Sequence, residues 1–153
     1  MSLSNHAPVA RIPRYVLVGT HHHITARATG GHALFIDDDD RVYFLALLQG
    51  SMVRFKWKCH AYCLMGTHYH LIVEAPLEQL SRGMHRLNGL YATAFNERHQ
   101  RQGRLFADRF ASFVLRDEAH LAAASEYILQ NPVKAGLCKR AADWPWSRLG
   151  SSL

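Results

Sequence analysis

Two β-prone runs meet at a very short connection, and this pairing constrains the fold more than any other feature of the chain. The runs are KWKCHAYCLMG at 56–66 and THYHLIVEA at 67–75, which meet at Gly66-Thr67. Aromatic and β-branched residues favour strands, and a connection this short can join only antiparallel neighbours. The sequence therefore predicts a β-hairpin and, with it, an antiparallel sheet.

Hydrophobic periodicity and helix-start signals predict the other elements. These are a strand at 14–28, a helix at about 38–53, a long helix at 75–100, a short strand near 110–115 and a helix at 117–130. The acidic block Asp37–Asp40 is expected to cap the first helix, because negative side chains suit the positive end of a helix dipole. Asn131-Pro132 is expected to end the last helix, because the residue before proline disfavours helical geometry.

The order of these elements indicates an α+β fold. Strand, helix, strand, strand, helix, strand is the ferredoxin-like (RRM-like) β-α-β-β-α-β arrangement, with an antiparallel sheet and helices on one face. An extra C-terminal helix follows and carries Tyr127. We expect residues 1–13 to form a flexible N-terminal segment and residues 14–153 to form one domain.

Charge and composition limit the classes of function. The apolar runs are too short to cross a bilayer, no signal peptide is visible, and three cysteines give no disulfide framework, so we expect a cytoplasmic protein without a membrane partner. The net charge is +6, and the stretch from 82 to 116 is rich in arginine. Such a stretch can neutralise phosphates, although a solvated basic helix has the same composition. The candidate backbone contacts to nucleic acid are Arg82, Arg86, Arg98, Arg101 and Arg104.

His68 and His70 are candidate metal ligands. Side chains alternate along a strand, so the two imidazoles project from one face about 6–7 Å apart while Tyr69 points the other way. Two such imidazoles can share a divalent ion, but many His-x-His pairs merely line a surface. A metal site needs a third ligand, which this motif alone does not identify.

Tyr127 and Asn131 are spaced i and i+4, so they share one face of a helix. An amide oxygen can bind a hard metal ion, and a phenol can act as a nucleophile. The alternative is a buried core aromatic followed by a helix-capping asparagine. The spacing fits both interpretations.

Four segments match a known family in order. CLMGTHYHLIVE at 63–74 resembles the LMPNHxHLL signature of single-tyrosine HUH-type transposases, with MGT where MPN is common. YILQNPVKAGL at 127–137 resembles the YIxxNPVxAGL signature of the REP-associated tyrosine transposase branch. GRLFADRFASFVLRDEAHL at 103–121 and the segment at 21–48 are similar to other parts of that branch, so the resemblance runs from about Tyr15 to Ser147.

This resemblance implies metal-dependent nicking and strand transfer of single-stranded DNA through a 5′-phosphotyrosine intermediate. His68, His70 and Asn131 would be the metal ligands and Tyr127 the nucleophile. Mg or Mn is the expected metal, although two imidazoles would also accept Zn or Co. The histidines at 21–23 are expected at an edge of the site or on a solvent-facing strand, and not on the metal.

The resemblance also implies the partners. We expect single-stranded DNA with hairpin or palindromic repeats, no small-molecule cofactor, and a monomer or homodimer. The rival interpretation is a non-catalytic module that binds nucleic-acid hairpins, which has the same basic surface and similar fold. A metal hydrolase that activates water is a third possibility, but it needs more ligands than the sequence offers.

Overall fold

The computed structural model describes residues 20–150, so the N-terminal segment 1–13 and the first residues of the strand expected at 14–28 lie outside the described residues. The elements are β1 (His21–Arg27), η2 (Thr29–Gly31), α2 (Asp38–Phe55), β2 (Lys58–Leu64), β3 (His68–Glu74), α3 (Leu77–Arg98), β4 (Ala111–Leu115), α4 (Glu118–Lys134), η3 (Ala141–Asp143) and β5 (Ser147–Leu149). From β1 to α4 the order of the main strands and helices is the one expected from the sequence. No helix in the described part of the chain is both long and apolar enough to cross a membrane.

The strands form one five-stranded sheet in the order β4-β1-β3-β2-β5, and all neighbours are antiparallel. The predicted hairpin joins β2 to β3, and the Met65 amide donates to the His68 carbonyl at 2.9 Å. β3 is the central strand, with β1 on one side and β2 on the other. The fold is therefore α+β with an antiparallel sheet.

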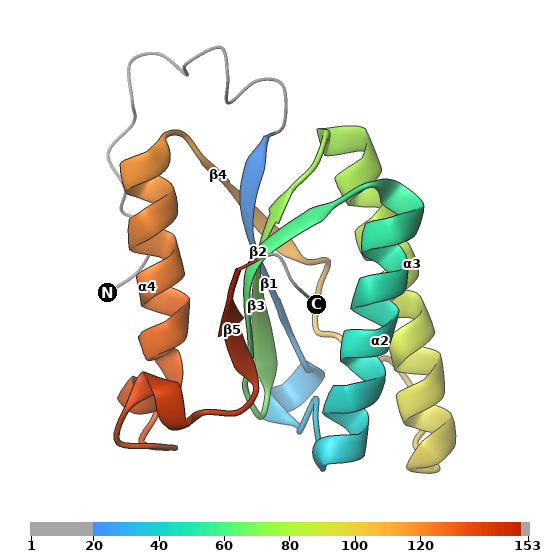
Figure 1. Cartoon of the computed structure of the whole chain (residues 1–153). Helices are drawn as coiled ribbons and strands as arrows, with labels where there is room; N and C mark the ends of the chain where they lie inside the picture. Colours follow the sequence, from blue (N-terminus) through green and yellow to red (C-terminus); the bar gives the residue numbers. More distant parts are fainter. Residues whose placement is uncertain (1–19, 151–153) are drawn as a thin grey trace.

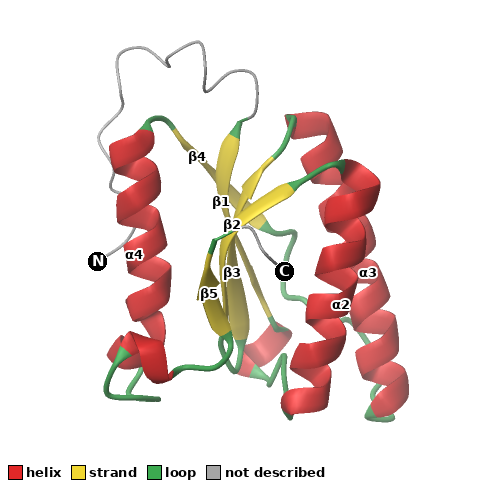
Figure 2. Ribbon diagram, in the orientation of Figure 1, coloured by secondary structure: helices red, strands yellow, loops and turns green. Residues whose placement is uncertain are grey.

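Helices cover both faces of this sheet, as Figures 1 and 2 show: α2 and α3 lie on one side and α4 on the other. Alternation along β3 sends Tyr69, Leu71 and Val73 into the larger core under α2 and α3. Ile72 joins a smaller cluster under α4 that includes Ile128. The expectation of helices on one face holds for α2 and α3, whereas α4 forms a separate layer.

α4 differs from its predicted end. It continues through Pro132 to Lys134, instead of stopping at Asn131-Pro132. The carbonyl of Asn131 accepts from the Ala135 amide at 3.0 Å, and that of Pro132 accepts from the Leu137 amide at 2.9 Å. Proline removes one hydrogen bond from a helix but leaves its own carbonyl free to accept, so one further turn forms before Gly136 adopts a φ of 76°.

The segment after α4 adds a strand that the sequence did not predict. β5 pairs with the edge of β2, with Arg148 opposite Tyr62. Leu64 anchors this segment twice: its amide donates to the Trp146 carbonyl at 2.8 Å, and its carbonyl accepts from the Trp144 indole at 3.0 Å. The tryptophans thus pack the C-terminal segment onto the sheet.

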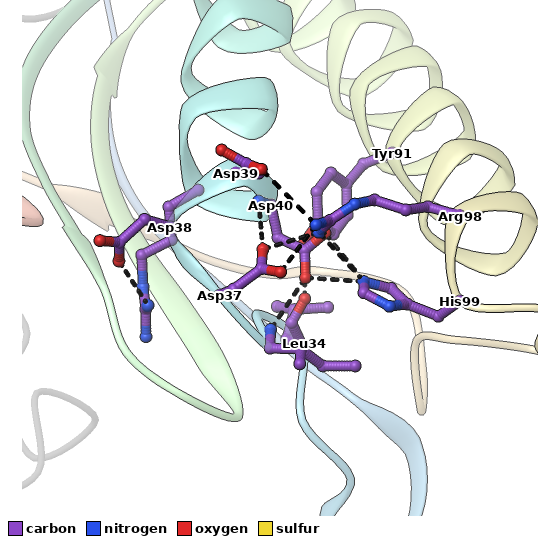
Figure 3. Close-up of polar contacts among 10 residues, drawn as sticks. Leu34, Asp37, Asp38, Asp39, Asp40, Tyr91, Arg98 and His99 are labelled. Atoms are coloured by element: carbon purple, nitrogen blue, oxygen red, sulfur yellow. Dashed lines mark hydrogen bonds and ion pairs between the residues drawn. The ribbon is translucent and has the colours of Figure 1, made fainter.

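An ionic cluster joins the start of α2 to the end of α3 (Figure 3). Asp37 caps α2 by accepting from the Asp40 amide at 3.1 Å, as the sequence predicted. The Arg98 guanidinium donates to Asp37 at 2.6 and 2.7 Å and to Asp40 at 2.7 Å, and His99 contacts Asp40 at 2.9 Å. Hydrogen bonding by Arg98 lowers the pKa of the Asp37 carboxyl to about 2.

Two glycines of α3 should respond in opposite ways to alanine substitution. A methyl group on buried Gly83 would overlap the indole of Trp57, whose N–H donates to the Gln79 carbonyl at 3.2 Å, whereas Gly89 faces open space. Gly83→Ala should lower the free energy of unfolding by about 1–3 kcal/mol through overpacking. Gly89→Ala should raise it by about 0.5–1 kcal/mol through helix propensity. Urea unfolding of both variants checks this, and equal signs would contradict the packing described.

The Asp37–Arg98 contact should make stability depend on pH. Because the folded pKa of Asp37 lies below its ordinary value of 3.8, its ionic contribution is present above about pH 4 and is lost as pH falls toward 2. Asp37→Asn retains a capping side chain and should therefore be less stable than wild type near neutral pH. This difference should vanish in acid. Asp38→Asn is the control, since Asp38 is in the same turn but contacts Arg41 instead. If Asp37→Asn remained less stable than wild type at low pH, the difference in stability would not come from the Asp37–Arg98 ion pair.

Candidate active site

His68 and His70 lie on the β3 face that α4 covers. Their rings are 5.0 Å apart between centroids and nearly perpendicular. His70 is buried, and His68 is partly exposed at the end of the strand. The alternation expected from the sequence therefore places both imidazoles on one face, opposite the buried ring of Tyr69.

α4 brings Tyr127 and Asn131 to the same place. The Asn131 amide nitrogen is 3.3 Å from Nε2 of His70. The Tyr127 ring meets the His70 ring edge-on, with centroids 6.1 Å apart. Residues from two distant segments of the chain thus converge on one site. Asn131 lies inside the helix and is not its cap.

The sequence left the histidines at 21–23 either at an edge of the site or on a solvent-facing strand, and the structure places His23 of β1 in the site. Nε2 of His23 is 3.0 Å from Nδ1 of His70, and both rings are buried. If Nε2 of His70 accepts from the Asn131 amide, then Nδ1 of His70 carries the proton and donates to His23. This hydrogen bond would fix the tautomer that leaves Nε2 of His70 able to bind a metal.

Burial keeps the two β3 histidines neutral. It lowers the pKa of His68 to about 4, with a further effect of the Arg27 charge. The pKa of His70 is lowered more strongly by burial, with added effects of His23, His68 and Arg27. Nδ1 of His68 contacts the Thr67 hydroxyl at 3.1 Å, so Nε2 is its remaining ring nitrogen. Two neutral imidazoles beside a side-chain amide are a suitable donor set for a divalent cation.

One cation lies beside Tyr127 and another beside the β3 histidines. The Lys134 ammonium, two turns further along α4, lies 5.3 Å from the centre of the phenol ring. Arg27 of β1 stands opposite His68 in the strand register and is exposed. Sequence reasoning missed Arg27. The signal that could have found it is alternation, since His23, Thr25 and Arg27 share one face of β1.

The five arginines expected to contact nucleic acid are not gathered around Tyr127. Arg82 and Arg86 are exposed on α3, which covers the opposite face of the sheet (Figure 1). Arg104 lines a cavity of about 740 Å³ beside α3, together with Arg109 and His85.

The other two of these arginines have partners within the protein. Arg98 is engaged by Asp37 and Asp40 (Figure 3). Arg101 contacts the Asn96 side chain at 3.2 Å and the Arg104 carbonyl at 3.1 Å.

Comparison with known proteins places this site in context. The sequence model of the family described as "Transposase IS200 like" matches residues 17–131. A Haemophilus influenzae protein named "Putative REP-associated tyrosine transposase" is 25% identical over 132 residues, which cover 74% of this chain and 75% of that protein.

Two solved structures share the fold. A REP-associated tyrosine transposase bound to a REP hairpin superposes with a TM-score of 0.68 at 18% identity, covering 96% of this chain and 82% of that one. A "putative transposase" from Deinococcus radiodurans gives a TM-score of 0.53 at 15% identity, covering 80% of this chain and 95% of that one. Since the family match spans most of the sequence and includes β1, the hairpin and α4, the chain belongs to the IS200-like transposase family.

Proposed function

We propose that this transposase nicks and rejoins single-stranded DNA through a covalent bond to Tyr127. The observation that carries the proposal is the meeting of Tyr127 and Asn131 of α4 with His70 of β3. Family membership supports the same chemistry. The ferredoxin-like arrangement of β1 to β4 would serve as the rigid base, because strands hold side chains more precisely than loops do.

In the proposed reaction the Tyr127 oxygen attacks the scissile phosphorus. A bond forms between that oxygen and the 5′-phosphate, the bond from phosphorus to the 3′ oxygen breaks, and the phenol proton is transferred as the 3′-hydroxyl leaves. Water is not consumed, so a 3′-hydroxyl of another strand can reverse the step and join two ends. The Lys134 ammonium near the ring would favour negative charge developing on the phenol oxygen.

His68, His70 and Asn131 would hold a divalent cation, with Mg or Mn as the proposed metal. When bound, it would supply positive charge that stabilises the phosphate oxygens during attack. The protein's part is to keep both imidazoles neutral by burial and to orient His70 through His23. Asn131 would turn its amide so that the oxygen faces the ion.

The proposed substrate is DNA that folds into hairpins, since one solved relative is bound to a REP hairpin. Lys134 beside Tyr127 and exposed Arg27 beside the histidines are candidate cations for a phosphate bound at this site. Arg82, Arg86 and Arg104 could contact a more distant part of the strand. Arg98 and Arg101 would have to leave their present partners first.

One chain supplies every residue of this site, which favours a monomer over a homodimer with a shared site. A cytoplasmic location, where chromosomal DNA is accessible, fits this proposal. The rival function is hairpin binding without cleavage, and a covalent adduct separates the two.

Tyr127→Phe should abolish the covalent protein–DNA adduct while leaving DNA binding intact. Loss of the nucleophilic oxygen should lower adduct formation by at least about 10³-fold. The measurement is a denaturing gel after incubation with Mn²⁺ and a labelled hairpin oligonucleotide. Tyr43→Phe is the matched control, because Tyr43 is an exposed tyrosine of α2. A wild-type protein that binds hairpins but forms no adduct would favour the rival function.

His23→Ala should weaken metal binding through His70 without removing a ligand. Loss of an orienting hydrogen bond typically costs ~10–100-fold in metal affinity. In His23→Ala, adduct formation should then require more Mn²⁺ and should recover at a high Mn²⁺ concentration. His23→Gln should restore part of the metal affinity, because its amide oxygen can accept the hydrogen bond from His70. His68→Ala should not recover. The check is the Mn²⁺ dependence of the adduct rate, with EDTA as a blank; equal Mn²⁺ dependence in wild type and His23→Ala would exclude a positioning role.

A further inference from the structure

A second cluster of metal-binding residues lies on the same face of the sheet, at the other end of its central strands. It consists of His21 of β1, His60 of β2 and Glu74 of β3. One ligand atom from each residue can be chosen so that all three lie within 4.8 Å of one another. Glu74 is four residues from His70 along β3, so the two sites are separated by about 13 Å.

The strand register brings these three side chains together. His21 is directly opposite Glu74 across the β1–β3 pair. On the other side of β3 the register shifts between Cys59 and Ala61, which makes His60 the extra residue of a β-bulge. Bulges re-aim side chains. This one brings the His60 ring to 4.9 Å from the His21 ring, between centroids.

The distances suit a small tetrahedral ion. Nε2 of His21 is 3.4 Å from one Glu74 oxygen, and Nε2 of His60 is 3.8 Å from the other. Ligand atoms bound tetrahedrally to zinc at 2.0–2.1 Å stand about 3.4 Å apart. These two distances reach different Glu74 oxygens, and one ligand atom from each residue lies within 4.8 Å of the others, so the side chains would have to close by up to about 1.4 Å around a shared ion.

The surroundings of the cluster also favour a cation. Nε2 of His60 is enclosed and makes no hydrogen bond to the described residues. The Lys58 ammonium is 3.6 Å from Glu74, but this side chain is 71% exposed and can turn into solvent.

We propose that His21, His60 and Glu74 form a zinc site distinct from the site of Tyr127. Two imidazoles and one carboxylate match the ligands that zinc prefers. Water would take the fourth position. Bound zinc would tie together β1, β3 and β2, and β1 also carries His23, which orients His70.

The test is metal binding by the untagged protein. Calorimetry measures the zinc affinity, and the visible spectrum of the Co²⁺-substituted protein reports the coordination geometry. His60→Gln and Glu74→Gln should each weaken binding at this site by ~100-fold or more, since even residues outside the ligand set cost 10–100-fold. Both should lose the tetrahedral Co²⁺ bands of this site. His68→Gln, altered at the other site, should retain them, and His85→Gln, an exposed histidine of α3, should match wild type.

Thermal unfolding gives an independent readout that a failure of the proposed DNA chemistry would not affect. Saturating zinc should raise the Tm of wild type and of His68→Gln by about 5 °C. It should raise the Tm of His60→Gln and Glu74→Gln much less. Unchanged zinc affinity, Co²⁺ spectrum and Tm shift in both the His60 and Glu74 variants would overturn the proposal, as would zinc binding that only His68→Gln removes.

Discussion

β3 lies at the centre of the sheet, hydrogen-bonded to β1 and β2, and its side chains alternate between two environments. Tyr69, Leu71 and Val73 are completely buried under α2 and α3, and the Tyr69 hydroxyl donates to Asn88 at 2.6 Å. The residues that alternate with them along β3 point to the face that α4 covers, and they include His68, His70 and Glu74. Packing on one face therefore fixes the position of the polar groups on the other, since the strand cannot rotate without exposing its core residues.

This division of the sheet separates stability from chemistry. The larger core joins β3 to α2 and α3, and the Asp37–Arg98 cluster joins α2 to α3, on the face of the sheet opposite α4. On the other face α4 rests on a smaller cluster through Ala124 and Ile128. Ile128 is the direct neighbour of Tyr127, so the contact that seats the helix also sets the direction of the phenol. His70, a proposed ligand, can thus be buried while Tyr127, the proposed nucleophile, stays partly exposed.

The sequence was informative where the signal is local. The hairpin at Gly66-Thr67, the capping aspartates and the helical spacing of Tyr127 and Asn131 depend on residues close together in the chain, and the structure agrees with each. Joining the two halves of the site required the family resemblance, because no local pattern relates His70 to Asn131.

What the sequence did not predict depends on long-range pairing. The sequence left the place of His23 open between two alternatives and did not point to Arg27, because the register in which β1 pairs with β3 decides the position of both. The sequence suggested that Arg98 could contact DNA. In the structure its guanidinium is paired with the carboxylates of Asp37 and Asp40, which are 61 and 58 residues away in the chain. β5 was hidden for the same reason, since it is a strand only when β2 is beside it.

β5 also has a consequence for the solubility of the protein. An uncovered strand edge offers unpaired amides and carbonyls to other chains and promotes aggregation. Residues Ala61–Cys63 of β2 are apolar and buried, and β5 pairs with them while Trp144 and Trp146 tie it to Leu64. The segment after α4 therefore covers the edge of β2. A chain cut short after α4 would keep all the residues of the Tyr127 site and yet be prone to edge-to-edge association.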